Sequence, residues 1–140
     1  MRFASIDIGS NAVRLLLSDV LESKRKPVFK KAELVRVPLR LGEDAFITGK
    51  ISKEKISKLV SAMKAFGNLI DAFDVVAYRA CATASMREAK NSTEVIRRIW
   101  REAKIKVEVI DGKTEADMIY SNHVEENLNK KNSYLYIDVG

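Results

Sequence analysis

The chain has 140 residues, 46% of them hydrophobic, and a formal net charge of +6 at pH 7. A chain of this length typically buries roughly 70% of its unfolded surface, so we expect one globular domain with a substantial core. The single cysteine excludes an intramolecular disulfide, and no stretch approaches the roughly 20 apolar residues of a membrane span. With no secretory leader in view, we expect a cytoplasmic protein. The positive charge favours an anionic partner, and nucleic acid, polyphosphate and anionic membrane all remain open.

The first forty residues predict three strands in an antiparallel meander. Residues 2–8 and 13–20 are apolar enough for strands and close enough to form a hairpin. Residues 28–39 alternate between apolar and polar side chains, which is typical of a third strand. Pro38 indicates that this strand ends there or lies at a sheet edge, because proline cannot donate a ladder hydrogen bond.

Helices and strands then alternate. Ser52 is a good N-cap for an amphipathic helix over residues 52–72, and residues 75–81 are typical of a short strand. Asn91 and Glu94 resemble a capping box, opening a helix that turns Val95, Ile96, Ile99 and Trp100 inward. The chain ends with a strand at 105–110, a helix capped by Thr114 and a strand at 134–140. The helix carries on one face Ala116, Ile119, Tyr120, His123 and Leu128.

This order, βββαβαβα and one more strand, predicts an α/β domain with a mixed sheet. The meander pairs antiparallel, and the strand–helix–strand units pair parallel through right-handed crossovers. That is the pattern of a ribonuclease-H-like domain, here over residues 1–132. The last strand, within residues 133–140, then begins a second domain that is otherwise missing.

Polar residues follow three of the predicted strands, at residues 7–11, 81–87 and 111–115. In open α/β sheets, ligands bind beyond the carboxyl ends of the parallel strands, so these segments are expected to meet at one edge. Gly9, Ser10 and Asn11 suit a phosphate cradle, because they offer main-chain, hydroxyl and amide donors without bulk. The same tripeptide is equally typical of a tight hairpin turn.

Each charged candidate has a structural alternative. Asp7 could hold Mg²⁺ through water, or cap the turn. Arg87 could bind phosphate through its planar guanidinium, or form a surface salt bridge with Glu88 or Asp111. Glu115 could complement a helix dipole, or orient and deprotonate a water that attacks phosphorus.

Other candidates favour structural roles. His123 is expected in the middle of a mostly apolar helix face, and Cys81 as a small buried hydrophobe. The basic residues Lys24, Arg25, Lys26, Lys30 and Lys31 surround a turn at the opposite end of the meander from Gly9. A basic nucleic-acid-binding module is disfavoured, since Phe29 is the only aromatic residue among them.

The segment IDVG at 137–140 repeats IDIG at 6–9, which indicates a duplicated architecture with one phosphate loop in each half. Together with IDIGSNAVRLLL, LRLGED, RACATASMREAKN and VEVIDGKTEADMIY, it resembles the exopolyphosphatase and guanosine pentaphosphate phosphohydrolase family over nearly the whole chain. That family belongs to the actin, sugar-kinase and heat-shock-chaperone superfamily, and the chain is similar to its first domain.

The resemblance implies Mg²⁺-dependent removal of the terminal phosphate from inorganic polyphosphate or guanosine pentaphosphate. It places the first phosphate loop at Asp7, Gly9, Ser10 and Asn11, the central arginine at Arg87 and the catalytic glutamate at Glu115. The second phosphate loop begins at Asp138 and Gly140, and Asp7 and Asp138 lie nearest the metal.

Two positions depart from the family pattern, Ala12 in place of a small hydroxyl residue and Asp117 in place of arginine. The first removes a possible phosphate donor, and the second adds a carboxylate near Glu115 or one that faces solvent. The rival functions are a sugar or acetate kinase of the same superfamily and a non-enzymatic polyanion-binding module. Substrate preference and oligomeric state, a homodimer included, stay open.

Overall fold

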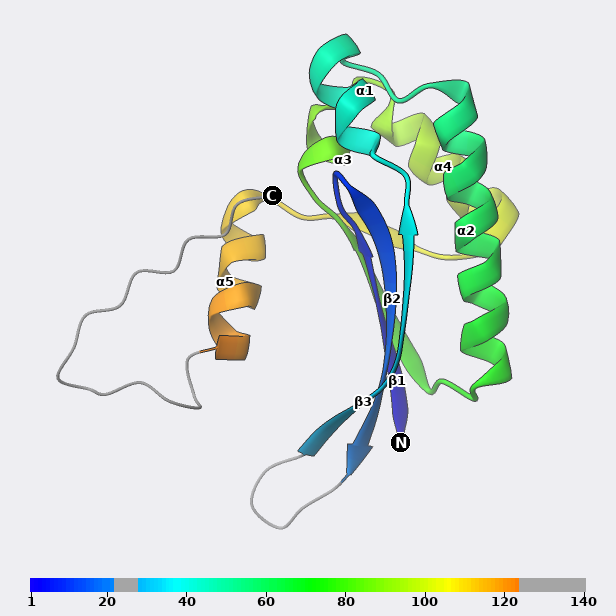
Figure 1. Cartoon of the computed structure of the whole chain (residues 1–140), viewed down its shortest axis with the longest axis vertical. Coiled ribbons are helices and arrows are strands. Elements are labelled where there is room, and N and C mark those ends of the chain that lie inside the picture. The colour runs from blue at the N-terminus through cyan, green and yellow to red at the C-terminus, as the bar shows by residue number, and fades with distance from the viewer. Residues whose placement is uncertain (22–27, 124–140) are drawn as a thin grey trace, which may run out of the picture.

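The computed structural model describes residues 1–21 and 28–123, which form an α/β fold with one mixed sheet and with its two longest core helices packed on one face. Five strands and five helices follow one another (Figure 1): β1 Arg2–Ile8, β2 Ala12–Leu21, β3 Val28–Pro38, α1 Leu41–Thr48, α2 Lys53–Ala72, β4 Ala77–Ala82, α3 Ala84–Glu88, α4 Ser92–Ala103, β5 Val107–Val109 and α5 Gly112–His123. The mixed α/β architecture predicted from the sequence is confirmed.

The sheet has the strand order β3-β2-β1-β4-β5. β1 pairs antiparallel with β2, and β2 with β3, whereas β4 pairs parallel with both β1 and β5. β3 is therefore an edge strand, and it ends at Pro38 as predicted. Because β1, β4 and β5 run in the same direction, the loops that follow them meet at one end of the sheet.

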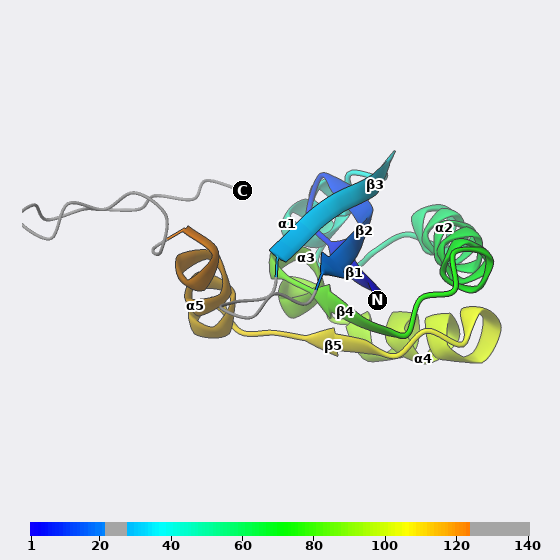
Figure 2. The ribbon, with the colours of Figure 1, turned by 90° about the horizontal axis from the view of Figure 1, so that it is seen from below.

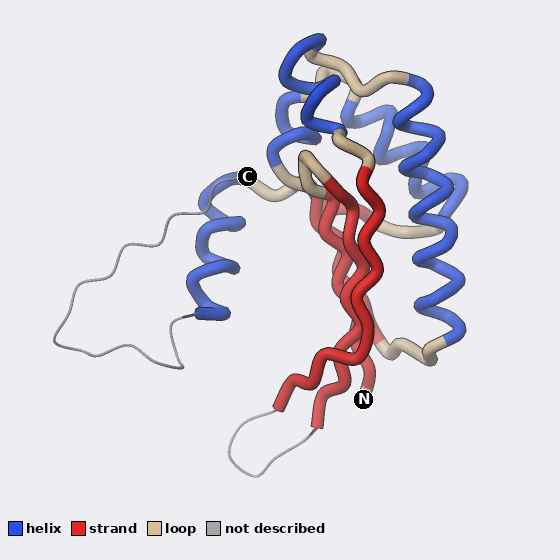
Figure 3. The backbone as a smooth tube through the Cα atoms, viewed as in Figure 1, coloured by secondary structure: helices blue, strands red, loops and turns tan. Residues whose placement is uncertain are grey.

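The two faces of the sheet differ in what covers them. Side chains alternate along a strand, so Val13, Leu15 and Leu17 of β2 point into the core, whereas Arg14 lies exposed on the other face. α2 and α4 pack on the core side and contact each other (Figures 2 and 3). α5 lies on the opposite side of the sheet in both Figure 1 and Figure 2.

The long helix α2 shows why the hydrophobic spacing was informative. Ser52 caps it by accepting a hydrogen bond from the Lys55 amide, and Leu59, Met63 and Phe66 are buried along one side. This helix was predicted from the three- and four-residue spacing of those side chains. The predicted N-cap and bounds agree with the structure to within one residue.

Three local predictions are wrong. Trp100 is 53% exposed, because it follows the buried Ile99 and points away from the face that α4 presents to the core. Asn91 stands at the N-cap of α4 as predicted but makes no capping bond; its side-chain amide instead exchanges two hydrogen bonds with the Ile51 backbone, at 2.9 and 3.0 Å. Asp111, not Thr114, caps α5, since its carboxylate accepts the Thr114 amide at 2.7 Å.

Two short helices, α1 and α3, were missed by the sequence analysis, as they are too short to show a helical repeat. The predicted strand at 134–140, the second-domain boundary at residue 133 and Leu128 lie outside the described residues. Within the described part of the chain, no helix is long and apolar enough to span a membrane.

Candidate functional site

Three loops gather at the carboxyl end of the parallel strands. They follow β1, β4 and β5, and backbone hydrogen bonds join them: the Thr83 amide donates to the Ile8 carbonyl at 3.3 Å, and the Ile110 amide donates to the Ala82 carbonyl at 3.0 Å. These loops therefore meet at the carboxyl end of the parallel strands, as the positions of the polar residues predicted.

The loop after β1 is a hairpin turn that also presents backbone N–H groups able to donate hydrogen bonds. The Gly9 amide is occupied, because it donates to the Ala12 carbonyl at 3.1 Å. The amides of Ser10 and Asn11 have no hydrogen-bond partner within residues 1–21 and 28–123. Two adjacent backbone N–H groups of this kind can bind an anion, so the turn and cradle interpretations are compatible. A Cβ atom at Gly9 would lie 3.3 Å from the Ala12 carbonyl oxygen, so glycine suits this tight turn.

The start of α1 holds this loop in place. The Gly42 amide donates to the Ser10 carbonyl and the Arg40 amide donates to the Asn11 carbonyl, both at 2.9 Å. A Cβ atom at Gly42 would lie 2.9 Å from the Ser10 Cβ, closer than real Cβ contacts come. Glycine is thus required for this close approach. α1 supports this loop and was missed by sequence reasoning, for which the only available signal was the LRLG segment at 39–42.

Arg87 and Glu115 form an ion pair at the same edge. Arg87 Nη1 lies 2.9 Å from Glu115 Oε2 and also donates to the Ile110 carbonyl at 2.9 Å. The two side chains are 28% and 29% exposed. The partner of Arg87 is therefore Glu115, and not Glu88 or Asp111 as the structural alternative had it.

The cap of α5 determines where Glu115 lies. The Asp111 carboxylate accepts the Thr114 amide, and the Asp111 carbonyl accepts the Glu115 amide at 3.0 Å. Its hydrogen bonds with Thr114 lower the pKa of Asp111, so this cap stays ionised. Glu115 consequently sits in the first turn of the helix. An acidic side chain is electrostatically favoured in the first turn of a helix. Glu115 therefore complements the helix dipole, whether or not it also acts as a base.

Asp7 lies beside the cradle, with both carboxylate oxygens within 4 Å of the position that a Cβ on Gly9 would take. Arg14, its neighbour on β2, makes a 3.4 Å contact with it. Burial raises the pKa of Asp7; Arg14 lowers that pKa, and the negative charge of Glu115 raises it. Asp7 and Glu115 are thus near enough to interact electrostatically.

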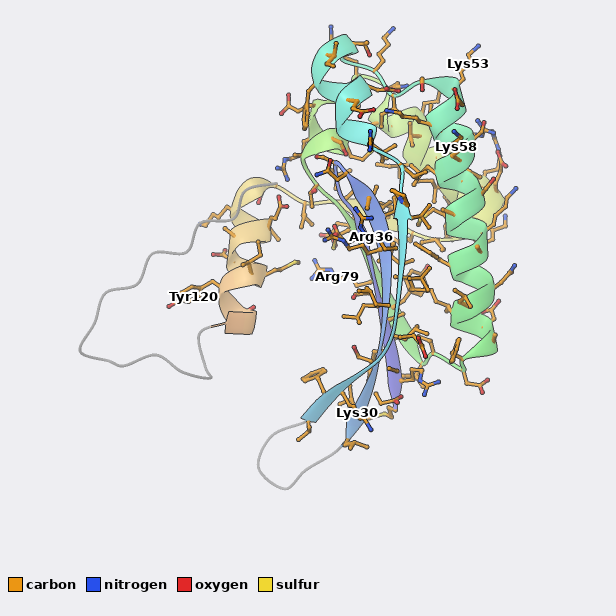
Figure 4. The ribbon with its side chains drawn as sticks, viewed as in Figure 1. Lys30, Arg36, Lys53, Lys58, Arg79 and Tyr120 are labelled. Carbon is orange, nitrogen blue, oxygen red and sulfur yellow. The ribbon has the colours of Figure 1, made fainter. Side chains whose placement is uncertain are left out.

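The remaining candidates lie apart from this cluster or are described only in part. Cys81 is half-buried on the face away from α2, and burial raises the pKa of its thiol. Asp117 is exposed on α5. His123 is the last residue of α5, and Lys30 lies on β3 at the end of the sheet away from α1 and α3 (Figure 4). Lys24, Arg25, Lys26, Asp138 and Gly140 lie outside the described residues.

The carboxylates at this edge suit a cation that substrate helps to bind. Among the described residues, no group of three or more His, Cys, Asp or Glu side chains could hold a metal ion. Mg²⁺, however, often uses only one or two carboxylates, with water and substrate phosphates as its other ligands. Asp7, half-buried and beside the cradle, fits that requirement.

Comparisons with known proteins agree with the architecture. A sequence model of the Ppx/GppA phosphatase family matches residues 22–140. Exopolyphosphatase 1 of Mycobacterium leprae is 30% identical over 120 residues, which cover 86% of this chain and 34% of that protein. A bifunctional 3-dehydroquinate synthase/phosphatase of Fusobacterium nucleatum is 28% identical over 98% of this chain and 21% of its own length.

Solved structures give the same result. The crystal structure of the Aquifex aeolicus member of the Ppx/GppA protein family superposes with a TM-score of 0.80 and 32% identity, covering 90% of this chain and 41% of that one. An exopolyphosphatase from Cytophaga hutchinsonii gives a TM-score of 0.77 and 30% identity, covering 84% and 36%. The chain therefore spans well under half the length of each of these relatives.

Proposed function

The chain belongs to the Ppx/GppA phosphatase family, and on that premise we propose that it is the first domain of a phosphohydrolase that removes the terminal phosphate of inorganic polyphosphate. Guanosine pentaphosphate is a second substrate of the same chemistry. The observation that carries the proposal is the Arg87–Glu115 pair, held at the same sheet edge as the free amides of Ser10 and Asn11.

In this proposal, the terminal phosphate lies against the Ser10 and Asn11 amides. Arg87 donates to a phosphate oxygen while its bond to the Ile110 carbonyl keeps it at the edge. Glu115, freed from part of its contact with Arg87, orients a water and accepts its proton as the water oxygen attacks phosphorus. The bond from phosphorus to the bridging oxygen then breaks, and the shortened chain leaves with that oxygen. Most of the catalysis is positioning and charge stabilisation.

Mg²⁺ is the proposed cofactor, with Asp7 and Asp138 as the carboxylates nearest to it. When bound, the ion would neutralise charge on the phosphate oxygens. We also propose that Gly140 begins a second phosphate loop, and that a second domain starting at residue 133 completes the site. The coverage of the relatives, 34% for the Mycobacterium leprae protein, supports a longer active protein.

Phosphate release from long-chain polyphosphate tests the two-domain proposal. It is measured with Mg²⁺ and without nucleotide, on this chain and on a form extended through the second domain. We expect turnover only from the extended form, because half of the phosphate contacts are missing from the shorter one. Equal turnover by both would contradict the proposal, and transfer of phosphate from a nucleotide to a small acceptor would favour a kinase.

The variant Glu115→Gln tests the catalytic role in the extended form. The amide keeps the size and the hydrogen-bonding capacity of the side chain but cannot take up a proton at neutral pH. Loss of a general base typically costs roughly 10² to 10⁴ in rate, so we expect turnover to fall by about that factor while polyphosphate binding is retained. Asp117→Asn, an exposed carboxylate two residues along α5, is the matched control. Full turnover by Glu115→Gln would remove Glu115 from the base role.

A further inference from the structure

Arg40 has an unusual backbone conformation next to the cradle. Its φ of 49° and ψ of 49° place it in the left-handed region, which costs a residue other than glycine folding free energy. Hydrogen bonds fix both sides of this residue: its amide donates to the Asn11 carbonyl at 2.9 Å, and its carbonyl accepts from Lys55 Nζ at 2.6 Å. The surrounding structure therefore imposes the conformation, and glycine would satisfy it with less strain.

The side chain of Arg40 contributes little to the fold. It is 71% exposed, and its one ion pair among the described residues is a long 3.5 Å contact with Glu43. Glu43 does not depend on it, because Lys55 lies 3.1 Å from the same carboxylate. The guanidinium can thus leave Glu43 without stranding a charge, and neither packing nor pairing accounts for an arginine at this position.

Backbone hydrogen bonds fix the place of the Arg40 main chain relative to the loop after β1. Arg40 lies directly against Asn11, and Gly42, two residues later, lies against Ser10. The segment at 40–42 therefore fixes the loop that carries the two amides, and the side chain that it bears at Arg40 is exposed. Arg87 belongs to α3, whereas Arg40 is the N-cap residue that precedes α1, so the two arginines come from different segments of the chain.

We propose that Arg40 is a further substrate-binding residue, whose guanidinium moves from Glu43 to the phosphate chain held at Ser10 and Asn11. This inference rests on the proposed function and adds a contact to that site. A planar guanidinium can form two parallel hydrogen bonds with phosphate oxygens, whereas a lysine acts as a point charge. Arg40 would then contribute to affinity for the polyanion and not to proton transfer.

A left-handed backbone conformation alone does not identify a binding residue. A second basic residue with this conformation, away from the site, serves as the control. Lys104 is also basic and left-handed, with a φ of 58°, but it ends α4, where such a conformation is common. It precedes β5, at the opposite end of the parallel strands from the cradle. Lys104→Gly therefore removes the same charge and the same backbone strain as Arg40→Gly, away from the site.

The test uses the protein with the second domain that we propose for it. Binding of long-chain polyphosphate is measured by calorimetry, and KM, kcat and the melting temperature are measured alongside. We expect Arg40→Gly to weaken binding and raise KM about tenfold, the effect of losing a charge-assisted hydrogen bond, with kcat changed less than about threefold. Its melting temperature should be unchanged or higher. Arg40→Lys should recover part of the affinity, and Lys104→Gly should leave affinity and KM unchanged.

The outcomes separate this inference from the function on which it rests. Arg40→Gly binding polyphosphate as tightly as the unaltered protein would overturn the role of Arg40, whatever the turnover. An equal loss of affinity in Lys104→Gly would also overturn it, because the effect would then be one of net charge. If the unaltered protein binds polyphosphate without releasing phosphate, the proposed hydrolase activity is wrong. The affinities of Arg40→Gly and Lys104→Gly for polyphosphate then still test the binding role of Arg40. If it binds no polyphosphate, both proposals fail.

Discussion

At the scale of single residues, Arg87 connects the end of one strand to the start of the next helix. Its guanidinium donates to the Ile110 carbonyl and to the Glu115 carboxylate, both at 2.9 Å. A single donor atom, Nη1, makes both contacts, and the other guanidinium N–H groups have no partner in the part of the chain that the structure describes, so they remain for an anion. An arriving phosphate can therefore be bound without first breaking the link that holds Arg87 at the sheet edge.

Cys81 gives a pH-dependent prediction. It is the only cysteine in the chain, so its thiol is the one that an alkylating reagent reports. Burial, the largest cause, raises its pKa, and the nucleophile is the thiolate. At pH 8 we expect iodoacetamide to modify the folded protein several-fold more slowly than the urea-unfolded protein, with the difference shrinking as pH rises. Labelling is followed by mass spectrometry, with Cys81→Ser as the unlabelled control. Equal rates in the two states would contradict the burial of this thiol.

Sequence reasoning identified which residues lie at the site better than it identified their partners. Asp7, Arg87 and Glu115 were placed at one edge because each follows a predicted parallel strand, and the structure brings them there. The ion pair between Arg87 and Glu115 joins residues 28 positions apart, so no local pattern could indicate it. Arg40 was missed for the same reason, since its backbone conformation depends on contacts with Asn11 and Lys55.

At the scale of elements, the short helices and the long ones differ in how far the sequence predicts them. α2 has 20 residues and shows several turns of apolar repeat, whereas α1 has eight residues and exposes Phe46 and Ile47. A helix of two turns offers too few repeats to be recognised, and α1 also lacks a side-chain N-cap. Its place is determined by tertiary contacts, chiefly those of Gly42 and Asp44.

Asp44 joins α1 to α2 and provides a stability prediction. Its carboxylate accepts the Ser52 amide at 2.9 Å and lies 2.9 Å from Lys55 Nζ. The hydrogen bond with Ser52, and next the one with Lys55, lowers the pKa of Asp44 to about 2. Since an unfolded aspartate titrates near pH ~3.9, the ionised form stabilises the fold above about pH 4, and this stability is lost as pH falls toward 2.

The variant Asp44→Asn measures that contribution. Urea unfolding at pH 7 should give a free energy of unfolding lower by about 1.5 to 3 kcal/mol, the usual range for hydrogen bonds to a charged group. The gap from the unaltered protein should close between pH 4 and pH 2. Glu54→Gln, which removes an exposed pairing with Lys58, is the control and should change the free energy of unfolding much less than Asp44→Asn does. A gap that persists undiminished at pH 2 would contradict the assignment to the ionised carboxylate.

At the scale of the whole molecule, the sheet is covered unevenly. Helices α2 and α4 bury one face, while Arg36 and Arg79 stand exposed on the other, on the side where α5 lies (Figure 4). α5 itself contributes no buried side chain within residues 112–121, and Tyr120 is 56% exposed. Glu115, in its first turn, pairs with Arg87 of α3. The helix that carries the proposed base is thus the one least supported by packing.

This difference predicts unequal hydrogen exchange. A helix of 12 residues is marginal in water without tertiary contacts, whereas α2 buries seven side chains. We expect amides in α5 to exchange roughly 100-fold faster or more than those in the middle of α2, because local opening of α5 does not require the core to unfold. Mass spectrometry of peptides from the two helices measures this, and similar protection of both would contradict it.

The same measurement bears on the two-domain proposal. If the active site closes between two domains, the second domain must come close to Glu115, since the phosphate that Glu115 serves would be held from both sides. Amides in the first turn of α5 should then exchange more slowly in the extended form than in this chain, and more slowly again when polyphosphate and Mg²⁺ are added. Amides in the middle of α2, packed against α4 on the far side of the sheet, are the internal control and should not change. Unchanged exchange in α5 on addition of both the second domain and polyphosphate would contradict a site shared between the two domains.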